Sequence, residues 1–237
     1  MKHIPLYTNS RESAKQRREL TYWVESYHAN LACSQAIEAE IADSFDGHSL
    51  DNGAVQRVIG NYSFDRVNWV LQTTIQQDAA AHPDHQEWSQ GAYTHHLRDE
   101  MQDYKVCAEP AALDAFTAQA RQAWQELGLY DHTHCLTDDS KQDYHSKVLV
   151  LRPTSLADEY KNPLDQLFYC SGGFGARPEA SGRKIYGHFL HDDELCQFDR
   201  QDFIGVLKDE HLPDWAREKA ERIQRPNPLV MSEEPSL

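Results

Sequence analysis

Cysteine and histidine residues that could carry covalent chemistry lie close together in the C-terminal third of the sequence. Cys170 ends one apolar run and His188 lies in the next, so a hairpin between the two runs could bring these side chains together. A cysteine nucleophile requires an imidazole within hydrogen-bonding distance and a third group that orients it. Cys170 and His188 are therefore the catalytic candidates, although a free cysteine in an apolar strand is more often a core residue. We expect no catalytic residue and keep an enzyme as an alternative.

His132, His134 and Cys135 could bind a metal ion. Alternate residues of an extended segment face the same way, and imidazole together with thiolate suits zinc. A structural zinc site needs four ligands, and no second pair follows at a suitable spacing. The further residues that could contribute are Asp138, Asp139 and His145. We expect neither a metal ion nor another cofactor. If the protein is instead a zinc-dependent enzyme, these residues are the candidate ligands.

The glycine-rich stretch Ser171–Gly175 has the composition of a phosphate-binding loop. Such a loop leads into a helix and is usually followed by a lysine and a hydroxyl group. This stretch instead connects two apolar runs that have strand character, and it lacks that continuation. We therefore interpret it as a turn of a small sheet, in which Phe174 and Arg177 could contact a protein partner.

The acidic composition is the main global feature of the chain. Its 237 residues include 23 lysines and arginines and 38 aspartates and glutamates, for a formal net charge of −15. This charge disfavours binding to free nucleic acid or to a membrane surface and suits a basic protein partner, including the basic groove of a nucleic-acid enzyme. Ordinary solubility is the alternative explanation. The residues that we expect to contact a partner are Glu38, Glu40, Asp43, Phe174, Arg177, Asp192, Asp193, Asp209 and Glu210.

The elements that must position these residues change character along the chain. Apolar residues recur at threes and fours from Arg11 to about Phe45, which predicts one long helix. We expect a second helix from an Asp51 cap to Ile59, closed by Gly60, and a third that is capped by Ser63. For residues 79–105 we expect a loop with a short helix. A further helix begins at Pro110 and stops at Gly128.

Beyond residue 145 the periodicity becomes typical of strands. We expect strands at 148–151, 167–170, 185–190 and 195–198, with a hairpin turn at Asp192–Asp193 and a last helix from Pro213. The predicted fold class is therefore α+β, in which an N-terminal helical unit of about four helices is followed by a small, mainly antiparallel sheet and a C-terminal helix. The predicted domains are a helical domain at 1–130, an acidic linker at 131–145, a small α+β domain at 146–225 and a mobile tail at 226–237.

Cysteine usage and hydropathy suggest where the protein works. The five cysteines are widely spaced and form no Cys-x-x-Cys pair, which fits a reducing compartment. The N-terminus lacks the apolar core of a signal peptide, and no apolar run approaches the roughly 20 residues that span a bilayer. We expect a cytoplasmic protein.

Two blocks of sequence resemble known families. SYHANLACSQAIEAEIADSFDG (26–47) with FDRVNWVLQTTIQ (64–76) resembles an uncharacterised domain family carried on conjugative elements and plasmids of gut Firmicutes. LRPTSLADEY, NPLDQLFYCSGGFGARPEASGR and IYGHFL (within 151–190), with DFIGVLKDEHLPDW (202–215), resembles a second module of such mobile-element proteins, which are stand-alone or large and multidomain. Neither resemblance supplies an activity or a catalytic residue, and residues 79–145 resemble no family.

The resemblance implies a setting. Accessory proteins of mobile elements often protect incoming DNA against restriction enzymes or CRISPR nucleases, and many such inhibitors are small, acidic and non-enzymatic. We therefore expect an accessory protein that binds and inhibits a host defence nuclease, of the anti-CRISPR or antirestriction type, through an acidic surface. The alternatives are a non-enzymatic adaptor that docks other mobile-element proteins and a Cys/His or zinc-dependent enzyme.

Overall fold

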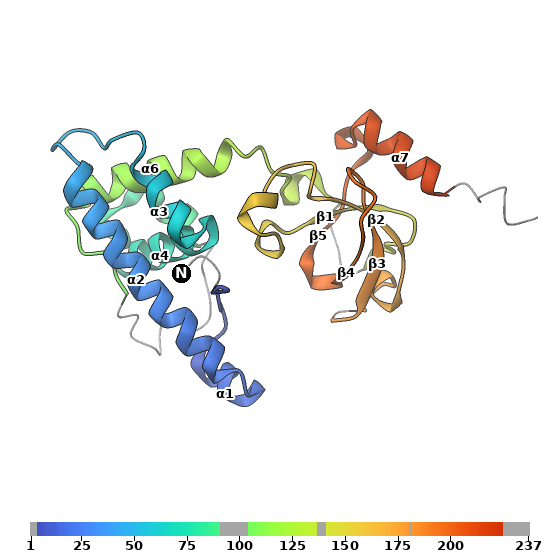
Figure 1. Cartoon of the computed structure of the whole chain (residues 1–237), viewed down its shortest axis with the longest axis horizontal. Coiled ribbons are helices and arrows are strands. Elements are labelled where there is room, and N and C mark those ends of the chain that lie inside the picture. Colours follow the sequence, from blue (N-terminus) through green and yellow to red (C-terminus); the bar gives the residue numbers. More distant parts are fainter. Residues whose placement is uncertain (1–3, 91–103, 137–140, 181, 225–237) are drawn as a thin grey trace, which may run out of the picture. The chain divides into compact units, whose positions relative to one another are not determined.

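The computed structural model describes residues 4–90, 104–136, 141–180 and 182–224. The chain divides into two compact units, Met1–Glu126 and Leu127–Leu237. The first is helical, and the second combines a sheet with a helix (Figure 1). The predicted α+β class is therefore confirmed: helices come first, then an antiparallel sheet and a C-terminal helix. Within the described residues, no helix is long and apolar enough to cross a membrane.

The long helix α2 of the first unit packs against α1, α3, α4 and α6 (Figure 1). Their bounds are α1 Arg11–Arg17, α2 Leu20–Ser44, α3 Ala54–Tyr62, α4 Phe64–Gln77, α5 Gln86–Ser89 and α6 Pro110–Gln125. Pro110 occupies the first turn of α6, as the sequence predicts.

The single long helix expected from Arg11 to Phe45 is interrupted. Arg18 adopts a left-handed conformation with φ 62° and caps α1, so that α2 starts anew at Leu20. The predicted apolar stripe also fails at its beginning, because Leu20 and Val24 are exposed. Small and polar residues instead form much of the buried face of α2: Ser26, Ala29, Asn30, Cys33, Ser34, Ile37 and Ile41.

Arg66 of α4 explains why polar residues line α2. Its side chain is only 1% exposed, and its guanidinium donates to the carbonyl oxygen of Ser26 at 3.1 Å, to Asn30 Oδ1 and to the carbonyl oxygen of Ile4 at 2.6 Å. A buried cation requires such oxygen partners, which an apolar helix face could not offer. Tyr7 N also donates to Ser26 Oγ at 2.9 Å, so this network holds the N-terminal segment against α2.

The turn signals around α3 and α4 are only partly correct. The expected cap at Asp51 and the expected stop at Gly60 are wrong, because α3 begins after Gly53 and continues through Gly60 to Tyr62. Ser63 does cap α4, since its hydroxyl accepts from Arg66 N at 3.4 Å.

The second unit contains a five-stranded antiparallel sheet in the order β4-β3-β2-β1-β5. The strands are β1 Val148–Leu151, β2 Leu167–Gly172, β3 Lys184–Phe189, β4 Leu195–Asp199 and β5 Phe203–Val206, and α7 Asp214–Gln224 follows. The first four strands agree with the sequence prediction. β5 was not predicted, because its four residues include Gly205 and show no clear alternation.

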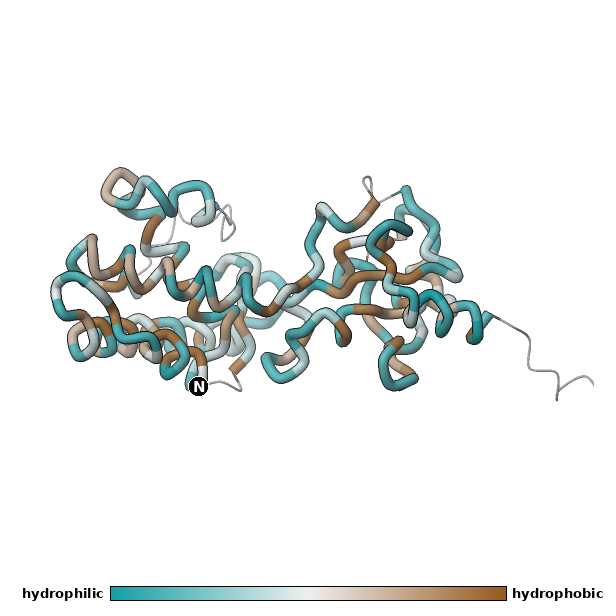
Figure 2. Tube along the Cα trace, turned by 90° about the horizontal axis from the view of Figure 1, so that it is seen from above, coloured by the Kyte–Doolittle hydropathy of each residue, from teal (hydrophilic) through white to brown (hydrophobic). Residues whose placement is uncertain are grey.

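The two faces of this sheet have different cores. On one face, Val148, Val150, Leu167 and Tyr169 pack with Ala216 and Ala220 of α7. On the other face, Phe168, Phe189, Phe198 and Phe203 form an aromatic cluster with ring centroids 5.4–5.8 Å apart. Hydrophobic residues gather along the strands, and the surrounding loops are largely hydrophilic (Figure 2). We call the second side the aromatic face.

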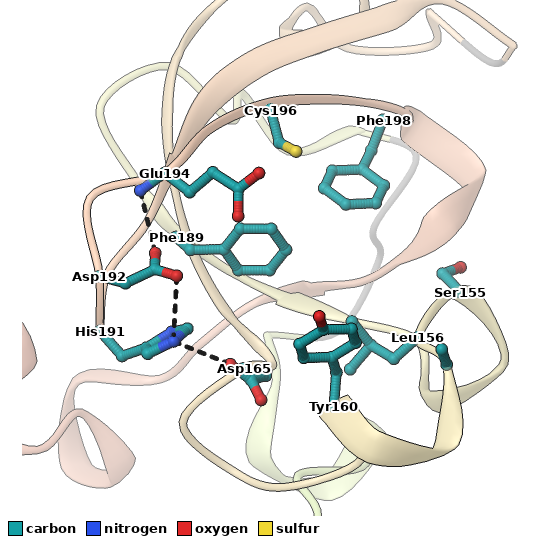
Figure 3. Close-up of a pocket in the computed structure, with 11 residues that line it drawn as sticks. Ser155, Leu156, Tyr160, Asp165, Phe189, His191, Asp192, Glu194, Cys196 and Phe198 are labelled. Carbon is teal, nitrogen blue, oxygen red and sulfur yellow. Dashed lines mark hydrogen bonds and ion pairs between the residues drawn. The ribbon is translucent and has the colours of Figure 1, made fainter.

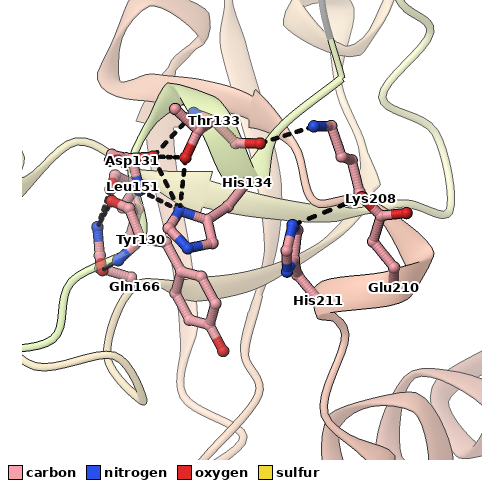
Figure 4. A network of polar contacts seen from close by, with 9 residues as sticks. All are labelled: Tyr130, Asp131, Thr133, His134, Leu151, Gln166, Lys208, Glu210 and His211. Carbon is pink, nitrogen blue, oxygen red and sulfur yellow. Dashed lines mark hydrogen bonds and ion pairs between the residues drawn. The ribbon is translucent and has the colours of Figure 1, made fainter.

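The described part of the segment predicted as an acidic linker packs into the second unit. Cys135 is 2% exposed and forms a bridge with Leu207, and Tyr144 is completely buried in the aromatic face. Gln166 is also buried, and its amide exchanges hydrogen bonds with the backbone N and O of Tyr130 (Figure 4). The polar composition of the segment predicted a linker, because only a few isolated side chains make these contacts.

Candidate functional site

A pocket of about 260 Å³ opens on the aromatic face between the β3–β4 hairpin and the segment 155–165 (Figure 3). Its apolar wall includes Leu156, Phe189 and Phe198, and Tyr160 lies at its edge with 55% of the residue exposed. Three carboxylates, of Asp165, Asp192 and Glu194, also line it. We call this the acidic pocket; its full lining is Ser155, Leu156, Ala157, Tyr160, Asp165, Phe189, His191, Asp192, Glu194, Cys196 and Phe198.

A tight turn places two of the carboxylates. Asp193 has φ 66°, and its N–H donates to the Phe189 carbonyl oxygen at 3.1 Å. The Asp192 carboxylate accepts from Glu194 N at 2.9 Å, which holds both side chains at the end of the hairpin. Aspartate tolerates the left-handed region better than most residues. The two aspartates therefore allowed the hairpin turn to be predicted from the sequence.

A buried ion pair shapes the opposite wall. Lys161 Nζ lies 3.0 Å from Asp158 Oδ1 and donates to the Leu156 carbonyl oxygen at 2.6 Å, and these lysine and aspartate side chains are 1% and 8% exposed. Asn162 Oδ1 then accepts from the N–H groups of Leu164 and Asp165 at 2.9 and 3.0 Å. The segment is thus fixed by its own polar groups.

His191 links the two walls. Its Nε2 lies 3.1 Å from Asp165 Oδ1 and 3.2 Å from Asp192 Oδ2 (Figure 3). Lys219 Nζ makes an ion pair with Asp193 at 3.0 Å, just outside the pocket. Glu194 has no cationic partner among the described residues, so the pocket keeps an excess of negative charge.

An aromatic and aliphatic wall beside carboxylates favours one kind of ligand. The ligand should carry an apolar stem that covers Phe189, Phe198 and Tyr160 and a cationic end that meets the carboxylates. Lysine and arginine side chains have this form. In the described residues no hydrogen bond joins the Cys196 thiol to His191.

The structure does not bring Cys170 and His188 together. Cys170 lies opposite Gly187 in the β2–β3 ladder, and His188 lies opposite Tyr169, so the two side chains point to opposite faces of the sheet. Cys170 is fully buried, and this burial raises the pKa of its thiol to about 11. A thiol with these properties is a poor nucleophile.

The metal candidates are also separated. His134 Nδ1 lies 2.8 Å from Asp131 Oδ1, and its ring contacts His211 at 4.8 Å between centroids (Figure 4). Cys135 is buried, whereas His132 is exposed. The described residues contain no group of three or more histidine, cysteine or acidic side chains that could hold a metal ion. His145 is exposed near Gly172, and Asp138 and Asp139 lie outside the described residues.

The glycines at Ser171–Gly175 are explained by close packing. Gly173 has φ 113°, and a Cβ at Gly173 or Gly175 would overlap backbone atoms of Lys184 or Arg183. Phe174 is 70% exposed with the Arg177 guanidinium 5.6 Å from its ring centroid.

The expected partner-binding residues of the second unit lie in separate places. The loop of Phe174 and Arg177 precedes β3, whereas Asp192 and Asp193 follow it, so the two groups lie at opposite ends of this strand. Asp209 and Glu210 are exposed just before α7.

The other expected residues lie on α2 in the first unit. Glu40 is engaged by Arg57 at 2.6 Å, Glu38 accepts from Cys107 N at 2.6 Å, and Asp43 is exposed. Of the expected set, only Asp192 lines the acidic pocket. Asp165 and His191 complete it, and no sequence signal connects Asp165 with the distant hairpin.

The first unit has its own pocket of about 400 Å³, which Asp78, His82 and Cys107 help to line. His82 is 4% exposed, and its Nδ1 lies 2.6 Å from Asp114 Oδ1. This pair resembles the orienting contact of a catalytic histidine. Among the described residues, however, no hydrogen bond joins the Cys107 thiol to His82, and this thiol instead lies 3.8 Å from the Lys105 carbonyl oxygen.

Comparison with known proteins places the chain in a family without assigning its chemistry. Residues 6–125 match the model of a family described as protein of unknown function (DUF3849). Because the match covers half of the chain, the chain belongs to this family. The resemblance of residues 26–47 and 64–76 to an uncharacterised domain family is thus confirmed, and the match also includes residues 79–125, for which the sequence suggested no family. No curated protein and no solved structure matches.

Proposed function

We propose that the protein binds a basic protein partner and that this partner is a host defence nuclease whose nucleic-acid groove it blocks. The observation that supports this proposal is the acidic pocket, in which Asp165, Asp192 and Glu194 line an apolar cavity beside Phe189 and Phe198. The resemblance to mobile-element proteins supplies the choice of a nuclease as the partner.

The physical basis is competition for lysine and arginine. A nuclease groove presents these residues to the phosphates of its substrate. An arginine in the acidic pocket would place its stem on Phe189 and Phe198 and its guanidinium near Glu194. Contacts to a carboxylate and to an aromatic ring are stronger in such a partly desolvated place than in water. The overall charge of −15 would also speed the encounter with a basic surface.

The test measures DNA cleavage by purified restriction and CRISPR nucleases in the presence of the full chain. We expect one nuclease to be inhibited at micromolar concentrations of the chain and the inhibition to weaken steeply between 50 and 300 mM salt, roughly as for other charge-steered complexes. The variant Asp192→Asn/Glu194→Gln should weaken the inhibition about tenfold or more.

The matched control is Glu179→Gln/Glu218→Gln, which removes the same charge from exposed positions elsewhere in the second unit. Equal inhibition by both double variants would exclude the acidic pocket as the contact. If every nuclease in the panel stays fully active, the proposed partner is wrong. A stable complex with another mobile-element protein would then indicate the adaptor alternative.

A further inference from the structure

The two edges of the sheet differ. β5 is covered, because Leu136 N donates to the Val206 carbonyl oxygen at 2.9 Å and Lys208 N donates to that of His134 at 3.0 Å. β4 forms the other edge and pairs only with β3. In the part of the chain that the structure describes, no segment pairs with the outer side of β4.

The register shows which backbone groups of β4 point outward. One backbone hydrogen bond closes each end of the β3–β4 ladder. Phe189 N donates to the Glu194 carbonyl oxygen at one end, and Arg200 N donates to the Arg183 carbonyl oxygen at the other. Because paired and unpaired positions alternate in an antiparallel ladder, the N–H and C=O groups of Leu195 and Gln197 point away from β3.

This edge lacks the usual protection against pairing. Exposed edges are commonly blocked by lysine, proline, a bulge or an inward-facing charge. β4 reads Leu-Cys-Gln-Phe-Asp, and its pairing with β3 runs without a register shift. Leu195 is 72% exposed, and its neighbour on the same face, Tyr186 of β3, is 51% exposed. β4 therefore offers both an open ladder and an apolar surface.

The same strand also lines the acidic pocket. Cys196 and Phe198 face the pocket, while Leu195 and Gln197 face the other side of the sheet. A strand laid along β4 would thus pass directly beside the pocket. At the hairpin end it would meet Asp192 and Glu194.

We propose that an extended segment of the partner adds to β4 as a sixth strand and places one lysine or arginine in the acidic pocket. The basic character of the segment rests on the proposed function, whereas strand addition rests on the open edge. Backbone pairing would supply affinity, and the pocket would select the side chain. A second copy of this chain fits less well, because its own β4, Leu-Cys-Gln-Phe-Asp, contains no lysine or arginine for the pocket.

The probe is a phage-displayed library of random twelve-residue peptides, selected on the full chain. Enriched peptides should be poor in proline, should alternate β-branched or aromatic residues and should contain lysine or arginine. A synthetic copy of an enriched peptide then gives the dissociation constant by fluorescence anisotropy. Gln197→Pro removes one outward N–H group and should weaken binding at least about tenfold. The control Gln197→Thr keeps that N–H group and should bind within about twofold.

Amide hydrogen exchange tests the proposal on the unaltered protein, so it does not depend on the folding of Gln197→Pro. Peptide binding should slow exchange of the Leu195 and Gln197 amides at least about tenfold. The amides of Cys196 and Phe198 already face β3 and should change little. Peptides that bind without protecting Leu195 and Gln197 would overturn strand addition.

The outcomes separate this inference from the proposed function. If Asp192→Asn/Glu194→Gln abolishes peptide binding while Gln197→Pro does not, strand addition is wrong and the acidic pocket stands. If Gln197→Pro abolishes binding and the charge variant has no effect, strand addition holds and the basic partner is wrong. Sedimentation of the chain without peptide tests whether it forms a dimer. If it does, and if the Leu195 and Gln197 amides are protected from exchange in that dimer, the occupant of the edge is a second copy and the proposed partner segment is wrong.

Discussion

Arg200 joins the end of β4 to the loops that cover the aromatic face. It is 4% exposed, and its guanidinium donates to the carbonyl oxygens of Gly175 and Arg177, each at 2.9 Å, and to that of Gln142 at 2.7 Å. The guanidinium carbon also lies 3.7 Å from the centroid of the Tyr144 ring. One side chain thus donates to three carbonyl groups in two segments of the second unit.

Arg200→Met should destabilise the second unit by about 3 kcal/mol, because it leaves carbonyl groups without donors. The control is Arg183→Met, which changes an exposed arginine nearby and should cost at most about 0.5 kcal/mol. Urea unfolding, monitored by hydrogen exchange of the strand amides, measures the difference in stability between the two variants. Equal stability of the two variants would show that Arg200 is dispensable.

Thiol reactivity should follow burial. Burial raises the pKa of Cys33 to about 12 and that of Cys170 to about 11, so their thiolate fractions at pH 8 are about 10⁻⁴ and 10⁻³. Cys107 is exposed. Iodoacetamide at pH 8 should therefore label Cys107 first and leave Cys33 and Cys170 unmodified until the protein unfolds.

Mass spectrometry of the digested protein identifies the labelled cysteine. Cys33 should stay unlabelled in the folded protein at pH 7 and at pH 9, because its side chain is completely buried and only about one thiol in a thousand is ionised even at pH 9. Rapid labelling of Cys170 in the folded protein would contradict the buried position and would reopen its candidacy as a nucleophile.

At the scale of the element, one substitution should have opposite effects in a strand and in a helix. Gly187 lies in β3, where an added Cβ would overlap the Tyr169 carbonyl oxygen and the Phe168 ring. Gly187→Ala should destabilise the second unit by about 3 kcal/mol or more. Gly60 lies inside α3 with open space around the position of a Cβ, so Gly60→Ala should stabilise the first unit by about 0.5–1 kcal/mol.

Thermal or urea unfolding of the two variants checks this pair, and each serves as the control for the other. A stabilising effect of Gly187→Ala would show that β2 and β3 do not approach as closely as described. The sequence alone predicted Gly60 as a helix stop and treated Gly187 as an ordinary strand residue. The space around each Cβ position, which sequence does not reveal, decides both cases.

At the scale of the whole molecule, the two units should fold independently. Among the described residues, the two cores of the second unit consist of residues of that unit, and the helices of the first unit pack against one another. Fragments 1–126 and 127–237 should each unfold cooperatively, and their summed far-UV circular dichroism should match that of the full chain. An unfolded 127–237 fragment would show that this unit requires the first.

The sequence by itself determined the features that have local causes. Pro110 marks the start of α6 and Ser63 caps α4, because their effects act within one helical turn. Alternating apolar residues and the Asp192–Asp193 turn gave the β3–β4 hairpin. The α+β class follows from the change of periodicity along the chain, and the negative charge follows from composition.

Tertiary structure decided which distant residues meet. The polar face of α2 depends on a buried arginine from α4, and the acidic pocket depends on Asp165 reaching His191 from another loop. Cys170 and His188 lie on neighbouring strands, but their side chains point to opposite faces of the sheet. A shift of one residue in strand register moves a side chain from one face to the other. Local propensity acts over a few residues, whereas a binding site requires contacts across many, and packing alone fixes those contacts.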